Sequence, residues 1–383
     1  MTMSWMAAFR SAPVSPQEQM TLVHPPRGFH DETLRQIVRV RGGSDRLRVR
    51  ISNLYGNRPL TITRTQVAAL ESGSSTATST DTAVTFAGAV YVTVAAGEEV
   101  VSDPVEFVTT AETDLAISTY LAGETGLVTY HPFALQTGYV AQGDMASAPM
   151  LPGAHEVASR FHLSGIDLWR PEGGGLVAAF GDSQTDGVGT TPDANRRYSD
   201  QLARRLSPAN LSVVNLGIAG NRLLTDVFGE RGIARFDRDV VALPGGVTHL
   251  VLELGLNDIG MPGMFGLPAV SVADLTAGIT AIVERARRHG MTTIVATLTP
   301  FGGAAAIVPG FDTPENEEKR QQVNQWIRAT PDLGGIADLD RAVGDPAAPT
   351  NLLPHYDSGD HIHLNDAGAG RVAEVVARAI LSS

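Results

Sequence analysis

The sequence contains no cysteine and only one lysine, Lys319. The absence of cysteine excludes disulfides, thiolate nucleophiles, iron–sulfur clusters and cysteine-ligated zinc. The formal net charge is −12, and the sequence has no basic patch. Both features argue against nucleic acid or an anionic membrane surface as the main partner, because phosphate binding requires clustered cations. No apolar run approaches the roughly 20 residues that a membrane-spanning helix needs.

The start of the chain lacks the pattern of a secretory signal. Residues 1–12 contain no continuous apolar core behind a basic region. The sequence as it stands predicts a cytoplasmic protein, whereas a leader removed from a longer precursor would make it a secreted one. No His-rich spacing typical of metal ligands is present, so we expect neither a metal nor a cofactor. The sequence carries no signal for the oligomeric state.

The first 170 residues have the pattern of an all-β domain. Residues 46–52 alternate charged and apolar side chains strictly, as a half-buried antiparallel strand does. Residues 33–41 form another strand-like run, and the Gly-Gly-Ser-Asp sequence at 42–45 predicts a hairpin turn between the two. Further strands are predicted at 60–69, 83–86, 90–95, 105–109, 114–121 and 126–131. Many short strands at regular spacing predict a β-sandwich.

The pattern changes after the glycine-rich segment 169–175. The length of the whole chain already favours two domains. We place them at 1–170 and 176–383, with a linker at 171–175. The second domain alternates apolar strands with helices of period 3.6. Its strands are predicted at 176–180, 212–215, 249–254, 292–298 and 335–339, and helices at 274–289 and 367–381. This alternation predicts an α/β domain with a doubly wound parallel sheet of five strands, whose ligands bind off the carboxyl ends of the strands.

A serine follows the first of these strands directly. Residues 176–180 run into Gly181-Asp182-Ser183, a turn that would hold the Ser183 hydroxyl above the sheet edge. The same pattern also occurs as a plain turn before an N-capped helix. The rest of a serine-hydrolase site must therefore be sought downstream.

A histidine and a carboxylate suited to activating this serine stand near the C-terminus. Asp360 precedes His363 by three residues on a short loop. A carboxylate in that position can accept the imidazole Nδ1 proton and leave Nε2 free to take the serine proton. His361 and Asp357 are the alternative base and acid, but Asp360 is too close in sequence to His361 to orient its ring easily. We expect Ser183, His363 and Asp360 to form a catalytic triad.

Two other segments supply candidates for an oxyanion hole. An alkoxide that forms on a carbonyl oxygen needs preorganised donors. The backbone N–H groups of Ser183 and Gly220 and the side-chain amide of Asn257 are the three that we expect. Both downstream residues also have an ordinary structural interpretation, Gly220 as a turn glycine and Asn257 as a turn residue or helix cap.

Together these segments resemble the SGNH or GDSL hydrolase superfamily, whose four blocks carry Ser, Gly, Asn and His. Those residues fall here at Ser183, Gly220, Asn257 and His363. One departure is Gln184, which occupies the variable position where the family usually has leucine. The resemblance covers residues 175 to 383 and implies the flavodoxin-like SGNH hydrolase fold. The whole chain is also similar to a two-domain branch of the superfamily, in which a jelly-roll-like sandwich precedes the hydrolase domain.

The resemblance implies a serine esterase that hydrolyses short-chain acyl or acetyl esters through an acyl-enzyme. The substrate would be a small-molecule or carbohydrate-linked ester. Met264 and Phe265, in the loop after Asn257, and Phe301, after the fourth strand, are expected to contact the substrate, although the first loop could equally pack on a neighbouring helix. Two alternatives stay open: an acyltransferase or thioesterase that uses the same triad, and a glycan-binding protein with a silent hydrolase site.

Overall fold

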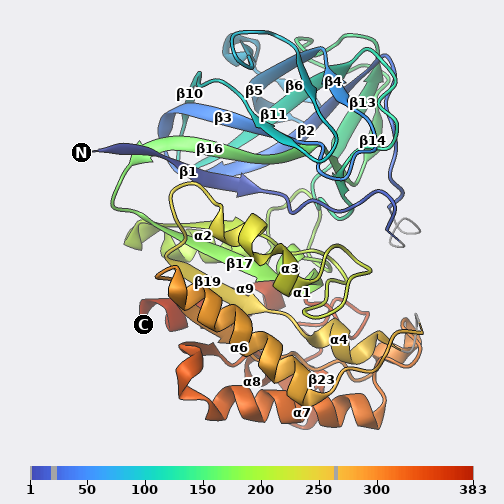
Figure 1. The fold of residues 1–383 in the computed structure, drawn as a ribbon, viewed down its shortest axis with the longest axis vertical. Helices are drawn as coiled ribbons and strands as arrows, with labels where there is room; N and C mark the ends of the chain where they lie inside the picture. Colours follow the sequence, from blue (N-terminus) through green and yellow to red (C-terminus); the bar gives the residue numbers. More distant parts are fainter. Residues whose placement is uncertain (1, 19–23, 263–265, 383) are drawn as a thin grey trace. The chain divides into compact units, whose positions relative to one another are not determined.

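The computed structural model describes residues 2–18, 24–262 and 266–382 and divides into two compact units. The first unit comprises Met1–Gly173 with Pro192–Asn195, and the second comprises Gly174–Thr191 with Arg196–Ser383. The first is built from strands, and the second from strands and helices (Figure 1). An all-β region therefore precedes an α/β region, as the sequence predicts.

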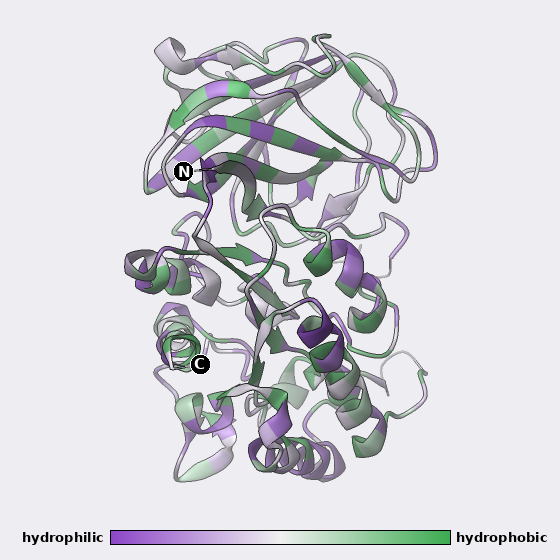
Figure 2. Cartoon of the chain, turned by 60° about the vertical axis from the view of Figure 1, so that its left-hand side comes forward, coloured by the Kyte–Doolittle hydropathy of each residue, from purple (hydrophilic) through white to green (hydrophobic). Residues whose placement is uncertain are grey.

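The first unit contains two large antiparallel sheets. One has the order β1 (Met3–Arg10), β16 (Leu163–Pro171), β3 (Ser44–Ser52) and β10 (Val105–Thr109), with β9 (Glu99–Val101) also paired to β3. The other has the order β14 (His155–Val157), β13 (Gly138–Gln142), β2 (Glu32–Arg41), β11 (Glu112–Leu121), β5 (Arg64–Ser72) and β6 (Ser75–Thr76), with β7 (Thr82–Ala83) paired to β5. Two short pairs complete the unit: β4 (Leu60–Ile62) with β8 (Val92–Val94), and β12 (Tyr130–His131) with β15 (Arg160–Phe161). Figure 2 shows hydrophilic and hydrophobic residues alternating along strands of this unit, which is the pattern of sheets with one buried face.

The predicted hairpin at 42–45 is wrong. β2 pairs with β11 and β13, whereas β3 pairs with β16, β10 and β9, so the turn joins two different sheets. The alternation in β3 was interpreted correctly, since Leu47, Val49 and Ile51 are buried. Alternation identifies the buried face of a strand but not its neighbours, and a glycine-rich turn can serve either connection.

The second unit is built on a five-stranded parallel sheet. Its order is β18 (Leu211–Asn215), β17 (Gly175–Gly181), β19 (His249–Glu253), β20 (Thr292–Ala296) and β21 (Gly335–Ala337). This is the flavodoxin-like order that the resemblance implies. The chain reverses its direction of winding between β17 and β19, and ligands of such sheets bind outside the carboxyl ends of the strands at that point.

Helices cover both faces of this sheet (Figure 1). On one face, α2 (Tyr198–Leu206), α8 (Leu339–Val343) and α9 (Asp366–Leu381) share an apolar cluster with side chains of the sheet. On the other, Phe236 of α3 (Gly232–Phe236) meets Phe180 edge to face, and α6 (Val272–Arg288) contacts both α3 and α7 (Pro314–Ala329). Two short helices, α1 (Ser183–Asp186) and α4 (Leu256–Gly260), follow β17 and β19, and a hairpin of β22 (Gly344–Asp345) and β23 (Ala348–Leu352) follows α8.

Helix α6, the longest of the described helices, has a capped start and one apolar face. α6 begins with a capping box, in which Ser271 Oγ accepts the Asp274 N–H at 3.1 Å and the Asp274 side chain accepts the Ser271 N–H. The residues of α6 that the structure buries are all apolar, as expected for a helix that packs on a sheet. Within the described ranges, no helix is both long enough and apolar enough to cross a bilayer.

Candidate active site

The turn between β17 and α1 holds Ser183 at the carboxyl end of β17. Asp182 caps α1, because its Oδ1 accepts the Gln184 N–H at 3.1 Å. A side chain at Gly181 would clash, since its Cβ would lie 2.0 Å from Thr185 Oγ1 and 2.7 Å from Glu253 O. The turn is therefore too tight for any residue but glycine at that position. It leaves Ser183 only 6 % exposed, at the sheet edge where ligands are expected.

The structure brings Ser183, His363 and Asp360 together. His363 Nε2 lies 2.9 Å from Ser183 Oγ, and His363 Nδ1 lies 2.6 Å from Asp360 Oδ2. An ionised carboxylate only accepts hydrogen bonds, so Nδ1 carries the proton and Nε2 presents its lone pair to the serine hydroxyl. The backbone N–H of His363 also donates to Asp360 Oδ1 at 2.7 Å, which fixes the carboxylate against its own loop.

The Asp360 carboxylate is held in its charged form. Burial by itself would raise its pKa, but the hydrogen bond and charge of His363 and the backbone N–H groups of His363 and Ile362 bring the pKa well below its ordinary value. A carboxylate that stays charged can stabilise an imidazolium beside it. His363 is therefore supported in both of the protonation states that a general base passes through.

The two downstream residues that the sequence proposed as oxyanion donors lie at the same edge of the sheet, because they follow the strands next to β17. Gly220, with a φ of +76°, lies in the segment after β18, and Asn257 lies in α4 after β19. Asn257 donates one amide N–H to Asn221 O at 3.1 Å, and its amide carries a second N–H. The segment after β18 is hydrogen-bonded to α1, the helix that begins at Ser183, since the Ala219 N–H donates to Asp186 Oδ2 at 3.0 Å.

Arg235 is a buried anchor for these segments that the sequence did not single out. Its guanidinium is fully buried and donates to Gly181 O at 3.0 Å, Leu216 O at 2.9 Å and Asn221 Oδ1 at 3.0 Å. Asp239 balances its charge, with Oδ2 at 3.1 Å from a terminal nitrogen. One side chain thus joins the end of β17 to the loop after β18. Nothing in the local pattern around Arg235 distinguishes it from a surface arginine on a helix.

Gln184 also has a role that sequence reasoning missed. Its Nε2 donates to Ile362 O at 2.5 Å and lies 3.5 Å from Thr299 Oγ1. The residue after the nucleophile is therefore hydrogen-bonded to the residue before His363. The sequence signal for this role was the glutamine in place of the family's usual leucine, because leucine cannot donate this hydrogen bond.

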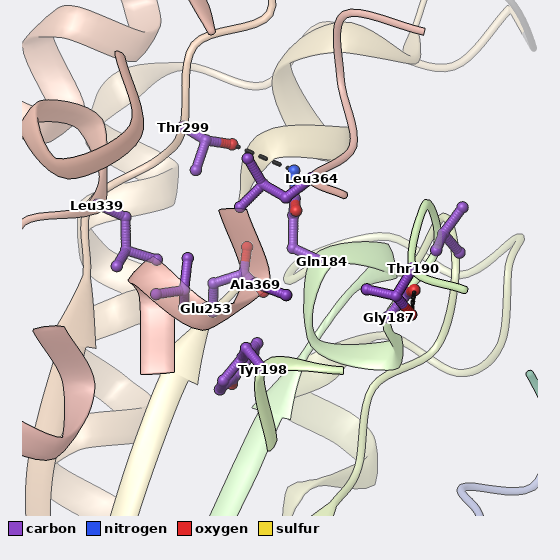
Figure 3. Close-up of a pocket in the computed structure, with 11 residues that line it drawn as sticks. Gln184, Gly187, Thr190, Tyr198, Glu253, Thr299, Leu339, Leu364 and Ala369 are labelled. Atoms are coloured by element: carbon purple, nitrogen blue, oxygen red, sulfur yellow. Dashed lines mark hydrogen bonds between the residues drawn. The ribbon is translucent and has the colours of Figure 1, made fainter. Parts of the chain in front are cut away.

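A small pocket of about 10 Å³ has Gln184 in its wall, and Figure 3 shows the residues that line it. Its walls come from α1, α2, α8 and α9, from the end of β19 and from the segment after β20, and include Tyr198, Glu253 and Thr299. Thr185 Oγ1 donates to Glu253 Oε2 at 2.7 Å. Burial raises the pKa of Asp182 to about 7, and burial together with the nearby Asp182 carboxyl raises the pKa of Glu253 well above its ordinary value.

The loop that carries Asp360 and His363 contains a second carboxylate–imidazole pair. His361 Nδ1 lies 2.6 Å from Asp357 Oδ2, and the His361 N–H donates to Asp357 Oδ1 at 3.1 Å. His361 has a φ of +64°, in the left-handed region that costs a non-glycine residue roughly 1–2 kcal/mol. The two histidines that the sequence offered as bases are thus both paired with an aspartate, and it is His363 that reaches Ser183.

Three residues were predicted to contact the substrate: Met264, Phe265 and Phe301. Met264 and Phe265 lie outside the described residues. Phe301 is only 1 % exposed and packs edge to face against Phe311 with ring centroids 5.3 Å apart. The expectation that Phe301 contacts the substrate stays a prediction; in the structure, apolar packing within the unit covers its ring.

Comparison with known proteins gave structural similarities of low sequence identity. A comparison with curated proteins found no match. The aryl esterase of M. smegmatis is 18 % identical, with a TM-score of 0.42 over 54 % of this chain and 99 % of that one. The acetyl xylan esterase AlAXEase is 19 % identical, with a TM-score of 0.42 over 54 % and 99 %. A carbohydrate esterase family 2 enzyme plus carbohydrate-binding domain, from Corynascus thermopiles (Myceliophthora fergusii), is 13 % identical, with a TM-score of 0.44 over 100 % and 99 %. Similarities of this degree say nothing about the substrate.

The family follows from the sequence itself. The segment from β17 to α9 holds Ser183, Gly220, Asn257 and His363 in the order of the four blocks. The model of the GDSL-like Lipase/Acylhydrolase family matches residues 179–371, which is about half of the chain. The protein therefore belongs to the GDSL-like lipase/acylhydrolase family of enzymes.

Proposed function

We propose that the protein is a serine esterase that hydrolyses short-chain carboxylic esters through an acyl-enzyme intermediate. The observation that carries this proposal is the pair of contacts at His363. Nε2 lies 2.9 Å from Ser183 Oγ, and Nδ1 lies 2.6 Å from Asp360 Oδ2. Both are within the range in which a proton is transferred or held by a hydrogen bond.

Acylation begins when Ser183 Oγ attacks the ester carbonyl carbon and its proton passes to His363 Nε2. The carbonyl oxygen becomes an alkoxide, and the backbone N–H groups of Ser183 and Gly220 and the Asn257 amide stabilise it. Removing one such donor costs about 10²–10³ in kcat in a comparable hydrolase site. The intermediate collapses as the bond to the alcohol oxygen breaks, and His363 Nε2 returns its proton to that oxygen.

Deacylation repeats the same steps with water. His363 Nε2 takes a proton from water, the resulting hydroxyl attacks the acyl carbon, and Ser183 Oγ leaves with the proton. Asp360 remains ionised throughout and balances the imidazolium that forms twice in each cycle. The products are a carboxylic acid and an alcohol.

The preference for short acyl groups rests on Phe301 and Gln184. The Phe301 ring is packed against Phe311 and is buried, so it offers no open apolar face to a long acyl chain. The small pocket that has Gln184 in its wall has room for about one water molecule, so a long acyl chain does not fit it. The Gln184 side chain is held in this wall by its hydrogen bond to Ile362 O.

The test is hydrolysis of p-nitrophenyl esters by the purified protein. We expect p-nitrophenyl acetate and butyrate to be hydrolysed faster than the dodecanoate, and Ser183→Ala to lower kcat by about 10⁶. Activity retained by this variant would contradict the mechanism. Faster cleavage of acyl thioesters, or transfer of the acyl group to an added alcohol, would instead favour the thioesterase or acyltransferase alternative.

A further inference from the structure

The Asp357–His361 pair has no part in the mechanism above, yet it is as well formed as the pair that does. Asp357 Oδ2 accepts from His361 Nδ1, while Asp357 Oδ1 accepts the N–H groups of Gly359 at 2.8 Å and of His361 at 3.1 Å. The carboxylate therefore fixes both the backbone and the ring of His361. In the neutral ring, Nδ1 carries the proton and Nε2 is the acceptor.

The surroundings of His361 keep this ring at the surface. Its side chain is 47 % exposed, whereas that of Asp357 is 12 % exposed. The ring packs against Gly303, where an added Cβ would lie 3.1 Å from His361 Cγ and Cδ2. Gly303 has a φ of +97°, and its N–H donates to Asp312 Oδ2 at 2.7 Å. The hydrogen bonds to Asp357 and the contact with Gly303 hold this exposed imidazole in place despite the backbone strain at His361, and strain of this kind gathers at functional sites.

The position of this imidazole relates it to one part of the substrate. His363 Nε2 must protonate the leaving oxygen, so the alcohol portion of the ester lies next to His363. The oxyanion donors follow β18 and β19 and serve the carbonyl oxygen instead. His361 is two residues from His363, so their Cα atoms are at most about 7 Å apart. The His361 ring also lies against Gly303, in the segment that follows β20, so the exposed imidazole lies at the same sheet edge as Ser183 and His363.

We propose that His361, held by Asp357, binds the alcohol portion of the substrate by accepting a hydrogen bond at Nε2 from a free hydroxyl group. The preferred substrates are then esters of polyols or sugars that keep a hydroxyl close to the ester oxygen. This inference rests on the proposed esterase function and specifies its substrate class. His361 is a specificity-determining residue in this account, and Asp357 is the positioning residue that orients it.

The experiment compares two acetate esters that differ in hydroxyl groups alone, glycerol 1-acetate and n-propyl acetate. We expect the protein to have the higher kcat/KM for glycerol 1-acetate. His361→Ala should reduce that preference about tenfold, chiefly through KM, because one hydrogen bond to the substrate is lost. His361→Gln should restore part of the preference, because its amide oxygen can accept the same hydrogen bond.

The control is His355→Ala, which removes a nearby histidine whose ring lies against Tyr356. It should leave the ratio of the two kcat/KM values unchanged. Equal loss of activity on both esters in His361→Ala would overturn the inference, since it would mean that His361 only supports the fold of the loop. A protein without preference for the glycerol ester would overturn it too. Failure of the esterase proposal looks different, since neither ester nor p-nitrophenyl acetate would then be cleaved in a Ser183-dependent way.

Discussion

The two Asp–His pairs of one loop have nearly the same geometry and different partners. In each, Nδ1 lies 2.6 Å from a carboxylate oxygen, and the other oxygen accepts the backbone N–H of the same histidine. His363 is 17 % exposed and meets Ser183, whereas His361 is 47 % exposed and lies against Gly303. A carboxylate that orients an imidazole is therefore not a sign of a catalytic base by itself. The group that Nε2 contacts decides whether the histidine can act as a base.

The largest expected difference between the pairs concerns the bases themselves. His363→Ala removes the group that takes the Ser183 proton and should lower kcat for p-nitrophenyl acetate by about 10⁶, as loss of a triad base does elsewhere. His361→Ala should have a much smaller effect on this substrate. Steady-state kinetics of the two variants measure both. If His361→Ala proved the more damaging change, the roles of the two histidines would have to be exchanged.

The two aspartates should differ by a smaller factor. Asp360→Asn leaves the loop geometry intact but can no longer hold the required tautomer of His363, and in a comparable triad such a change lowers kcat by about 10⁴. Asp357→Asn should leave most of this activity. The comparison is made on p-nitrophenyl acetate, with circular dichroism to establish that both variants are folded. Similar losses in both would mean that the loop acts as one unit.

The loop of the Asp360–His363 pair is also hydrogen-bonded to α1, the helix that begins at Ser183. Breaking that hydrogen bond should have a moderate effect on kcat. Gln184→Met keeps the volume of the side chain but removes the hydrogen bond to Ile362 O. We expect kcat to fall about fivefold with KM unchanged, since a hydrogen bond of about 1 kcal/mol would no longer position His363. Gln184→Ala serves as the comparison in which volume is lost as well. An unchanged kcat in Gln184→Met would show that the loop needs no such link.

Asp182 offers a third carboxyl for the comparison, one that no histidine contacts directly. Its pKa is about 7 in the folded protein, against about 3.9 for an unperturbed aspartate. Between pH 4 and 7 the folded state binds more protons at Asp182 than the unfolded state does. The stabilisation that this proton gives is therefore complete below pH 4 and is lost as the pH rises through 7.

Asp182→Asn should therefore flatten the fall in stability between pH 5 and 7, by up to about 1.4 kcal/mol per pH unit. Urea unfolding at a series of pH values measures this slope. Asp360 does not interfere in that window, because its lowered pKa leaves it ionised in both states there. Parallel curves for the two proteins would place the buried proton on another carboxyl.

The elements of the site could be predicted because each is local. The run into Gly181 and Ser183, and the three-residue spacing of Asp360 and His363, are patterns of adjacent residues. Parallel strands share a carboxyl end, so Ser183, Gly220 and Asn257, which each follow one of these strands, were expected at one sheet edge. The roles of Gln184 and Arg235 could not be predicted, since their partners lie far along the chain and are largely backbone oxygens, which leave no trace in the sequence.

The same limit explains the errors in the all-β unit. β16 was not predicted because six consecutive residues from Leu163 to Leu168 are buried, including Asp167, so that the strand lacks alternation. The strand continues to Pro171, which pairs with Met3 of β1. Asp167 is buried through ion pairs with Arg10, Arg48 and Arg50. A charge neutralised by distant arginines looks in the sequence like a surface residue.

The way Arg235 is bonded has a consequence for how such an enzyme can change over time. Two of its contacts are to the main-chain oxygens of Gly181 and Leu216, which every amino acid possesses. Neighbouring loop positions can therefore accept new side chains, and so new specificities, while this scaffold contact is retained. Arg235 itself has no such latitude, because lysine lacks the planar set of donors that spans both oxygens. Variation of the side chains at these loop positions therefore depends on the buried Arg235 staying unchanged.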